Sequence, residues 1–228
     1  MRIGIIGSGN IGGVLTRRLS ALGHAVAVAN SRGPASLASL AAETGASATT
    51  VEDAVKDRDV VILAVPLCRI PDLHGDLLAG APVVIDASNY YPRERDGLIA
   101  GIEAGMTESA WVAQHLGRPV IKAFNTIIAD HLRDKGLPAG TPGRIALAVA
   151  GDEAGPKAVA MQLIEVLGFD PVDSGAIADS WRQQPGTPGY LADLPVEGVR
   201  QALAAASHDR GPSWRATPDS PGTFDSPA

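Results

Sequence analysis

A chain of 228 residues with 45% hydrophobic and 19% charged residues has the composition of an ordinary globular protein, with one core and room for a small appended unit. Its formal net charge of −6 argues against a nucleic-acid partner, because binding to a phosphate backbone requires a basic surface. No apolar run approaches the roughly 18 residues that span a bilayer, and the single cysteine fits a reducing compartment, so we expect a cytoplasmic protein with no membrane partner.

Short β-type runs alternate with helix-length segments along the chain, which indicates βαβ units and a parallel sheet. The runs are rich in Val, Ile, Ala and Leu, as expected of strands that helices cover on both faces. We predict strands at Arg2–Ile6, His24–Ala29, Val60–Val65, Pro82–Asp86, Pro119–Phe124 and Arg144–Ala150. We predict helices at Ile11–Leu22, Pro34–Glu43, Val51–Lys56, Pro156–Leu167 and Glu197–Ala206. The expected fold class is α/β, a Rossmann-type, doubly wound, mostly parallel sheet with a small C-terminal α/β extension.

A glycine-rich turn joins the first predicted strand to the first predicted helix. It carries the G-x-G-x-x-G pattern in the strand–turn–helix context of dinucleotide-binding sites. Gly7 permits the tight turn, Gly9 leaves room for the backbone to approach a pyrophosphate, and Gly12 lets the helix pack closely on the sheet. The free N–H groups of the helix point at the phosphates. The predicted phosphate loop consists of Gly7, Ser8, Gly9, Asn10, Ile11 and Gly12.

The end of the second predicted strand indicates which dinucleotide the site prefers. Sites for NAD place an Asp or Glu about 20 residues after the glycines, where it binds the ribose 2′-hydroxyl. This chain has Asn30, Ser31 and Arg32 there and no acid. Arg32 and Ser31 can instead bind a 2′-phosphate through charge-assisted hydrogen bonds that contribute about 1.5–3 kcal/mol each. We therefore predict NADP(H) as the cofactor.

The next strands end in residues suited to the nicotinamide half of the site, because ligands of open α/β sheets bind beyond the carboxyl ends of strands. The expected walls around the nicotinamide are Ala64, Val65 and Pro66 after one strand, Ser88 and Asn89 after the next, and Phe124–Thr126 after the third. Ser88 and Asn89 also fit a simple turn. Asn125 and Thr126 are candidate catalytic residues that could hydrogen-bond a carbonyl of the acceptor or of the nicotinamide amide, or could simply satisfy loop backbone. The five histidines lack ligand spacing, so we expect no metal site.

The chain resembles the F420:NADP oxidoreductases, which depend on the deazaflavin coenzyme F420, from residue 1 to about residue 200. The segments that carry the resemblance are GIIGSGNIGG, NSRGP, VVILAVP, IDASN, VIKAFNTI at Val120–Ile127 and WRQQPGTPGY at Trp181–Tyr190. It implies hydride transfer between NADP(H) and a small-molecule acceptor, F420 or a flavin-like ring, and a homodimer. It also implies a phosphate loop at Ser8–Gly12, a 2′-phosphate pair at Ser31 and Arg32, and a ring-side wall at Ala64–Pro66. Because F420 has an anionic tail, a basic patch is expected, with Arg93, Arg95 and Lys122 as its candidates.

These inferences divide the chain into three parts. Residues 1–127 are the expected NADP-binding Rossmann domain, and residues 128–205 are a small C-terminal α/β part that closes the site. Residues 206–228 are rich in Pro, Ser, Asp and Gly, so they cannot bury enough apolar surface to offset their ordering entropy. We expect a disordered tail there, although Trp214 and Phe224 could dock elsewhere.

Two other functions are open on the sequence alone. The first is an NADPH-dependent reductase of a small imine, carbonyl or hydroxy acid, which normally has a sizeable helical domain for which little chain remains after Asn125. No proton donor for a carbonyl stands out in the sequence apart from Lys122. The second is a non-catalytic NADP(H)-binding redox sensor. Hydride transfer between two rings needs stacking and orientation rather than a strong acid or base, and this chain shows no obvious catalytic constellation.

Overall fold

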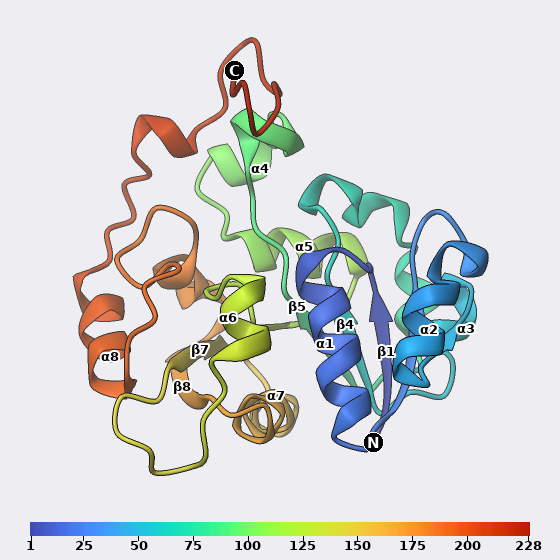
Figure 1. Ribbon diagram of the computed structural model, residues 1–228. Helices are drawn as coiled ribbons and strands as arrows, with labels where there is room; N and C mark the ends of the chain where they lie inside the picture. Colours follow the sequence, from blue (N-terminus) through green and yellow to red (C-terminus); the bar gives the residue numbers. More distant parts are fainter.

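The structure, a computed structural model, describes residues 1–228, except for the solvent exposure of Gly75. Eight strands form one sheet in the order β3-β2-β1-β4-β5-β6-β7-β8, and helices pack on both of its faces (Figure 1). The first six positions follow the Rossmann order 3-2-1-4-5-6. Only β6 and β7 pair antiparallel among the strand pairs of the described chain. The predicted α/β, mostly parallel, Rossmann-type fold is confirmed.

The strands match the sequence prediction closely in the middle of the sheet and less well at its edges. Their bounds are β1 Arg2–Ile6, β2 Ala25–Ala29, β3 Ser47–Ala48, β4 Val60–Leu63, β5 Val83–Asp86, β6 Ile121–Lys122, β7 Ala146–Ala150 and β8 Asp170–Gly175. All six predicted strands are present, but β6 is much shorter than its apolar run. The edge strands β3 and β8 were not predicted.

Helical segments lie between all consecutive strands of the chain. The α-helices are α1 Asn10–Ala21, α2 Ala38–Thr44, α3 Val51–Val55, α4 Ala100–Glu103, α5 Glu108–Leu116, α6 Ala129–Asp134, α7 Ala154–Val166 and α8 Val196–Ala205. The short 3₁₀ and π segments are η1 Pro34–Leu37, η2 Leu67–Asp72, η3 Gly75–Leu78, η4 Pro92–Asp96, η5 Ile177–Gln183 and η6 Pro212–Trp214. All five predicted helices are present, the second as η1 followed by α2, whereas α4, α5 and α6 were not predicted.

Each central strand is buried on both faces, so its consecutive side chains enter different cores. Ile5 and Ile62 belong to the core under α1, α6 and α7. Ile6 and Leu63 belong to the opposite core, which α3, α5 and η2 cover. All four side chains are at most 2% exposed. Burial of an aliphatic side chain of this size contributes about 1.5–3 kcal/mol, so these two cores hold the carboxyl ends of the strands in place.

The C-terminal part continues the same sheet. Strands β7 and β8 add to the β6 edge, and α8 packs on them through Val199 and Leu203. The remaining residues, 206–228, rise from α8 along the left side of Figure 1 and end at its top, above α4. Ala216 N donates to Glu103 Oε1 at 3.0 Å, and Gly222 N donates to Arg93 O at 2.7 Å. The tail that we expected to be disordered therefore has defined contacts, although none of its residues is buried.

No helix in the described part of the chain is long and apolar enough to cross a membrane.

Candidate functional site

The glycine turn after β1 has a different steric environment at each of its glycines. Gly7 has a φ of +106°, and an added Cβ would lie 2.2 Å from Ala64 O. A Cβ on Gly12 would lie 1.9 Å from Gly7 O, so α1 can approach the turn only because this residue is glycine. A Cβ on Gly9 would meet nothing within 4 Å. At Gly7 and Gly12 the turn packs directly against the protein backbone, whereas the space beside Gly9 is empty.

The helix that follows this turn presents free backbone donors. Gly9 is the N-cap of α1, no side chain caps the helix, and its first turn contains no acid. The first N–H groups of the helix, with the positive end of its dipole, are therefore available to an anion in the open space at Gly9. This geometry suits the pyrophosphate of a dinucleotide.

Asn30 at the end of β2 ties the glycine turn to the loop that follows it. Its Nδ2 donates to Ser8 Oγ at 2.9 Å and to Ser36 Oγ at 3.0 Å, and its Oδ1 accepts from Arg32 N at 2.9 Å. Asn30 is 9% exposed, and these contacts occupy its amide. Of the three residues predicted at this strand end, Asn30 therefore fixes the loop, while Ser31 and Arg32 project from it as exposed side chains.

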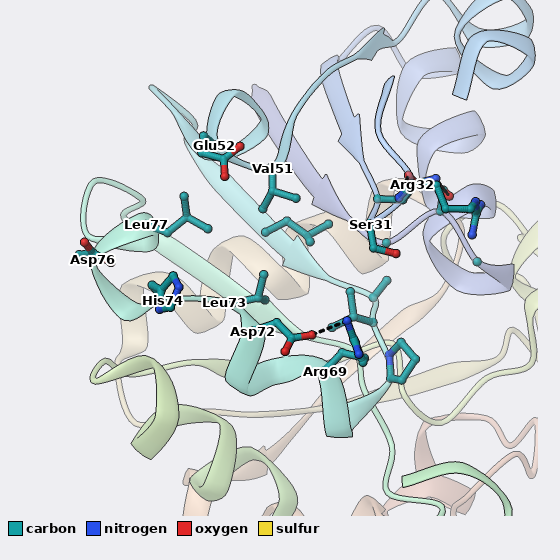
Figure 2. A pocket seen from close by; sticks show the side chains of 18 residues that line it. Ser31, Arg32, Val51, Glu52, Arg69, Asp72, Leu73, His74, Asp76 and Leu77 are labelled. Atoms are coloured by element: carbon teal, nitrogen blue, oxygen red, sulfur yellow. Dashed lines mark hydrogen bonds and ion pairs between the residues drawn. The ribbon is translucent and has the colours of Figure 1, made fainter. Parts of the chain in front are cut away.

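A cavity of about 850 Å³ lies beside the glycine turn and the ends of β2 and β4 (Figure 2). Nine of the residues predicted to bind the cofactor line this cavity, whereas Ile11 and Gly12 line neither it nor the hollow beside it. The nine are Gly7, Ser8, Gly9, Asn30, Ser31, Arg32, Ala64, Val65 and Pro66. Asn10 lines a neighbouring hollow of about 750 Å³ that also touches Ser8, Gly9 and Arg32. The Arg32 guanidinium has no hydrogen bond or ion pair with any residue that the structure describes.

Sequence reasoning missed the opposite wall of the cavity, which comes from α3 and from the segment after β4. Its residues are Val51, Glu52, Arg69, Asp72, Leu73, His74, Asp76 and Leu77. Figure 2 shows Leu73 and Leu77 among these side chains, and they make part of this wall apolar. Arg69 pairs with Asp72 at 2.7 Å. Because this segment directly follows β4, the rule that ligands lie beyond strand ends could have pointed to it.

The cavity does not include the predicted walls at the ends of β5 and β6. Asn89 Nδ2 donates to Asn125 O at 3.0 Å, and Asn125 Nδ2 donates to Gln183 O at 2.7 Å. Gln183 Nε2 returns a hydrogen bond to Asn125 Oδ1 at 2.9 Å. Asn125 is 2% exposed, so its amide joins η5 to the two strand ends. Thr126 is 7% exposed and accepts a hydrogen bond from Leu191 N through its backbone carbonyl.

Phe124 departs from our expectation that it forms a wall of the site. Its side chain is fully buried in the core on the α1 side of the sheet, and its φ is +64°, a conformation that is uncommon for a residue other than glycine. The turn after β6 directs the ring inward. Phe124 therefore supports the strand end from below.

A cluster of charged side chains is buried between β5, β6 and α5. Lys122 Nζ lies 3.3 Å from Asp86 Oδ2 and 3.7 Å from Glu108 Oε2, and all three side chains are fully buried. Asp86 also accepts hydrogen bonds from Ser88 Oγ at 2.5 Å and Ser109 Oγ at 2.6 Å. Burial raises the pKa of Glu108 to about 7, against the opposing effect of Lys122.

This burial corrects the expectation of a basic surface patch. Lys122 donates to Ser88 O inside the protein, so it is not available to an anionic tail. Arg95 forms an ion pair with Asp96 at 2.9 Å and lies over the ring of Tyr91 at 5.1 Å. Arg93 donates to Ala228 O. The three candidates therefore have separate partners.

Comparison with known proteins places the chain in a family. A solved structure of the hypothetical protein SMa0349 from Sinorhizobium meliloti is 35% identical, with a TM-score of 0.73 over 86% of this chain and 95% of that one. The family model described as NADP oxidoreductase, coenzyme F420-dependent, matches residues 2–90, from β1 to the loop after β5. The chain belongs to this family. The matched residues include the glycine turn and the β2 end described above, and the oxidoreductase class and NADP follow from the family.

Two other relatives and another solved structure match parts of this chain. The chain is 46% identical to YjhV of Escherichia coli (strain K12) over 85 residues and 30% identical to the metalloreductase STEAP3 of Rattus norvegicus over 187 residues. It spans 60% of the length of YjhV and 35% of that of STEAP3. A structure from Arthrobacter sp. fb24, named as a candidate F420-dependent NADP reductase, has the same fold, with a TM-score of 0.65 at 23% identity over 78% of this chain and 86% of that one.

Proposed function

We propose that the protein is an NADPH-dependent oxidoreductase that transfers a hydride between NADP(H) and a planar ring acceptor, the deazaflavin F420 or a flavin-like ring. The cavity beside the glycine turn carries this proposal. There, free N–H groups of α1, an open backbone at Gly9, and the exposed Ser31 and Arg32 come together. The N–H groups of α1 and the open backbone at Gly9 suit the pyrophosphate of NADPH, and Ser31 and Arg32 suit its 2′-phosphate.

The charged residues that line the cavity favour a 2′-phosphate at the Arg32 end and not at the opposite wall. Arg32 has no acidic partner among the described residues, so a 2′-phosphate could supply one. The acids Glu52 and Asp76 line the opposite wall, and Asp72 is paired with Arg69. A carboxylate next to Ser31 would repel a 2′-phosphate, and the chain has none at that strand end.

The residues of the chain then have modest tasks. Gly9 and the start of α1 bind the pyrophosphate, Ser31 and Arg32 bind the 2′-phosphate, and Ala64–Pro66 form the wall that excludes water beside the nicotinamide ribose. Transfer of a hydride oxidises NADPH to NADP⁺ and, with one proton from solvent, reduces the acceptor ring by two electrons. Binding and orientation can supply about 7–11 kcal/mol of such a barrier without an acid–base side chain.

The position of Lys122 favours a ring acceptor over a small carbonyl or imine. Reduction of a carbonyl needs a proton donor at the substrate oxygen. Lys122 was the sequence's candidate for that role, but it is fully buried, with Ser88 O and Asp86 as partners. It does not line the cavity.

Stopped-flow measurement of NADPH oxidation tests this function. The protein is mixed with NADPH and then with F420, FMN or a panel of small imines. We expect oxidation with a ring acceptor and none with the imines. Turnover of an imine without reaction toward either ring would contradict the ring acceptor, and no reaction with any acceptor would favour an NADP(H)-binding sensor. The homodimer that the family resemblance implies stays a prediction, which light scattering coupled to size-exclusion chromatography can check.

A further inference from the structure

Two tyrosines meet beyond the ends of β5 and β6. Tyr91 follows the Ser88–Asn89 turn after β5, and Tyr190 precedes Leu191, whose N–H donates to Thr126 O beyond β6 at 3.1 Å. The two hydroxyl groups are hydrogen-bonded to each other. Both rings are partly buried. Residues far apart in the sequence thus form one aromatic surface at the strand ends where ligands of open α/β sheets bind.

The indole of Trp214, from the tail, covers this surface. Its ring centroid lies 6.3 Å from that of Tyr91 and 6.1 Å from that of Tyr190, distances at which aromatic rings attract one another. The indole also packs on Gly186, where an added Cβ would lie only 2.5 Å from it. The indole is tilted by 42° to the Tyr91 ring and by 82° to the Tyr190 ring, so it meets both tyrosines at an angle and packs closely on Gly186.

The segment that holds this indole has little to keep it in place. No residue from 206 to 228 is buried, and Phe224, which contacts the edge of Tyr91, is 60% exposed. The tail contacts the body through hydrogen bonds with Glu103 and Arg93, through His208 stacked on Trp181 at 3.5 Å, and through Arg210 at 4.9 Å from the Tyr90 ring. Segments with few buried apolar contacts open at low free-energy cost.

A positive charge lies beside the two tyrosines. The Arg95 guanidinium sits 5.1 Å from the centroid of the Tyr91 ring, and its side chain is 28% exposed. Asp96 already pairs with this guanidinium at 2.9 Å, so a planar ligand would find an aromatic surface beside a stacked guanidinium rather than a free cation.

We propose that Tyr91 and Tyr190 form the binding seat for the acceptor's planar ring, and that Trp214 fills this seat in the free protein and leaves it when the ring binds. That the ring bound in this seat is the acceptor rests on the proposed function. That a planar ring and the indole compete for the seat is independent of that function. The tail thereby lowers the affinity for the acceptor and shields the strand ends from water until the acceptor arrives.

Riboflavin binding, followed by quenching of flavin fluorescence, tests the seat in the full chain without turnover. We expect Trp214→Ala to bind riboflavin about tenfold more tightly than the unmodified protein, because the competing ring is gone. Trp214→Phe keeps a ring in the tail and should lie close to the unmodified protein. Adding Tyr190→Leu to Trp214→Ala should abolish the gain, with circular dichroism as the check of folding.

The proposal is overturned if Trp214→Ala binds riboflavin no more tightly than the unmodified protein, or if the gain survives Tyr190→Leu. It is also overturned if Trp214→Ala binds riboflavin more weakly, because the indole would then be part of the binding seat.

A parallel assay of NADPH oxidation by FMN separates this inference from the proposed function. The expected gain in riboflavin binding without any ring-dependent NADPH oxidation would refute the function and leave the seat intact. Oxidation that Trp214→Ala leaves unchanged in KM for FMN would refute the competition and leave the function intact.

Discussion

Gly9 and Gly12 belong to the same turn, yet a side chain would have opposite consequences at the two positions. Gly9 has ordinary negative φ and open space around its missing Cβ, whereas Gly12 faces Gly7 O. We expect Gly9→Val to fold with an unchanged melting temperature and to lose NADPH binding, because the valine side chain would fill the space for the pyrophosphate. Quenching of protein fluorescence by NADPH, with a melting curve, measures both properties.

Gly12→Ala is the matched control for this variant. Its Cβ would lie 1.9 Å from Gly7 O, so α1 would have to move away from the sheet. The melting temperature should therefore fall, in contrast with Gly9→Val. Retention of micromolar NADPH binding by a well-folded Gly9→Val protein would show that the pyrophosphate does not lie at this turn.

Glu108 gives the protein a stability that depends on pH. Burial raises the pKa of this carboxyl from 4.5 to about 7, so the folded protein keeps a proton that the unfolded chain loses in this interval. The contribution of Glu108 to stability therefore falls as the pH rises through this interval and is constant above it. The full shift corresponds to a change on the order of 3 kcal/mol.

We expect Glu108→Gln to remove most of this dependence, since glutamine does not ionise. Urea denaturation at pH 5 and pH 8 should show a smaller loss of stability in Glu108→Gln than in the unmodified protein. Glu165→Gln, on the exposed side of α7, serves as the control and should behave like the unmodified protein. Parallel pH profiles of the Glu108→Gln and unmodified proteins would contradict the raised pKa.

At the scale of elements, predictability follows from the chemistry of each segment. The central strands β1, β4 and β5 are short runs rich in aliphatic residues, the pattern of strands that are buried on both faces, so the sequence alone predicted them. Strand β8 has the sequence DPVDSG, in which Pro, Asp and Gly disfavour a strand, and it forms only because the edge of β7 is available. The pairing with β7, rather than the local strand propensity of the residues, therefore determines that this segment is a strand.

The turn after β6 shows the same limit at the candidate site. The run Pro119–Phe124 predicted a strand through Phe124, which would place its ring at the strand end, but β6 stops at Lys122 and the chain turns with Phe124 at positive φ. We expect Phe124→Ala to lower the free energy of unfolding by about 3–5 kcal/mol, because it opens a cavity in the core.

Chemical denaturation of Phe124→Ala measures this loss, and Phe124→Leu should recover part of it by filling the space. At temperatures where Phe124→Ala is folded, its affinity for NADPH should match that of the unmodified protein. A stable Phe124→Ala protein with weakened NADPH binding would instead place the ring at the site, as the strand pattern first indicated.

At the scale of the whole molecule, the glycine turn after β1 and the C-terminal tail both lie beyond the carboxyl ends of the parallel strands. The sequence predicted the glycine turn and the β2 end, because both rely on contiguous residues with fixed spacing. It could not predict that Asn89, Asn125 and Gln183 join, or that Trp214 reaches Tyr91, because such contacts depend on how distant segments fold back. The tail's composition predicted a disordered tail at residues 206–228, whereas the structure gives these residues contacts to Glu103 and Arg93, although none of them is buried.

Calorimetric titration of NADPH and NADH into the unmodified protein tests the central claim most directly, namely that Ser31 and Arg32 make the cavity an NADPH site. We expect NADPH to bind at least about tenfold more tightly than NADH, the difference that one or two charge-assisted hydrogen bonds to a 2′-phosphate provide. In the double variant Ser31→Asp with Arg32→Ala, the two affinities should approach each other through weaker NADPH binding. Equal affinity of the unmodified protein for NADH and NADPH would contradict the assignment of these two residues.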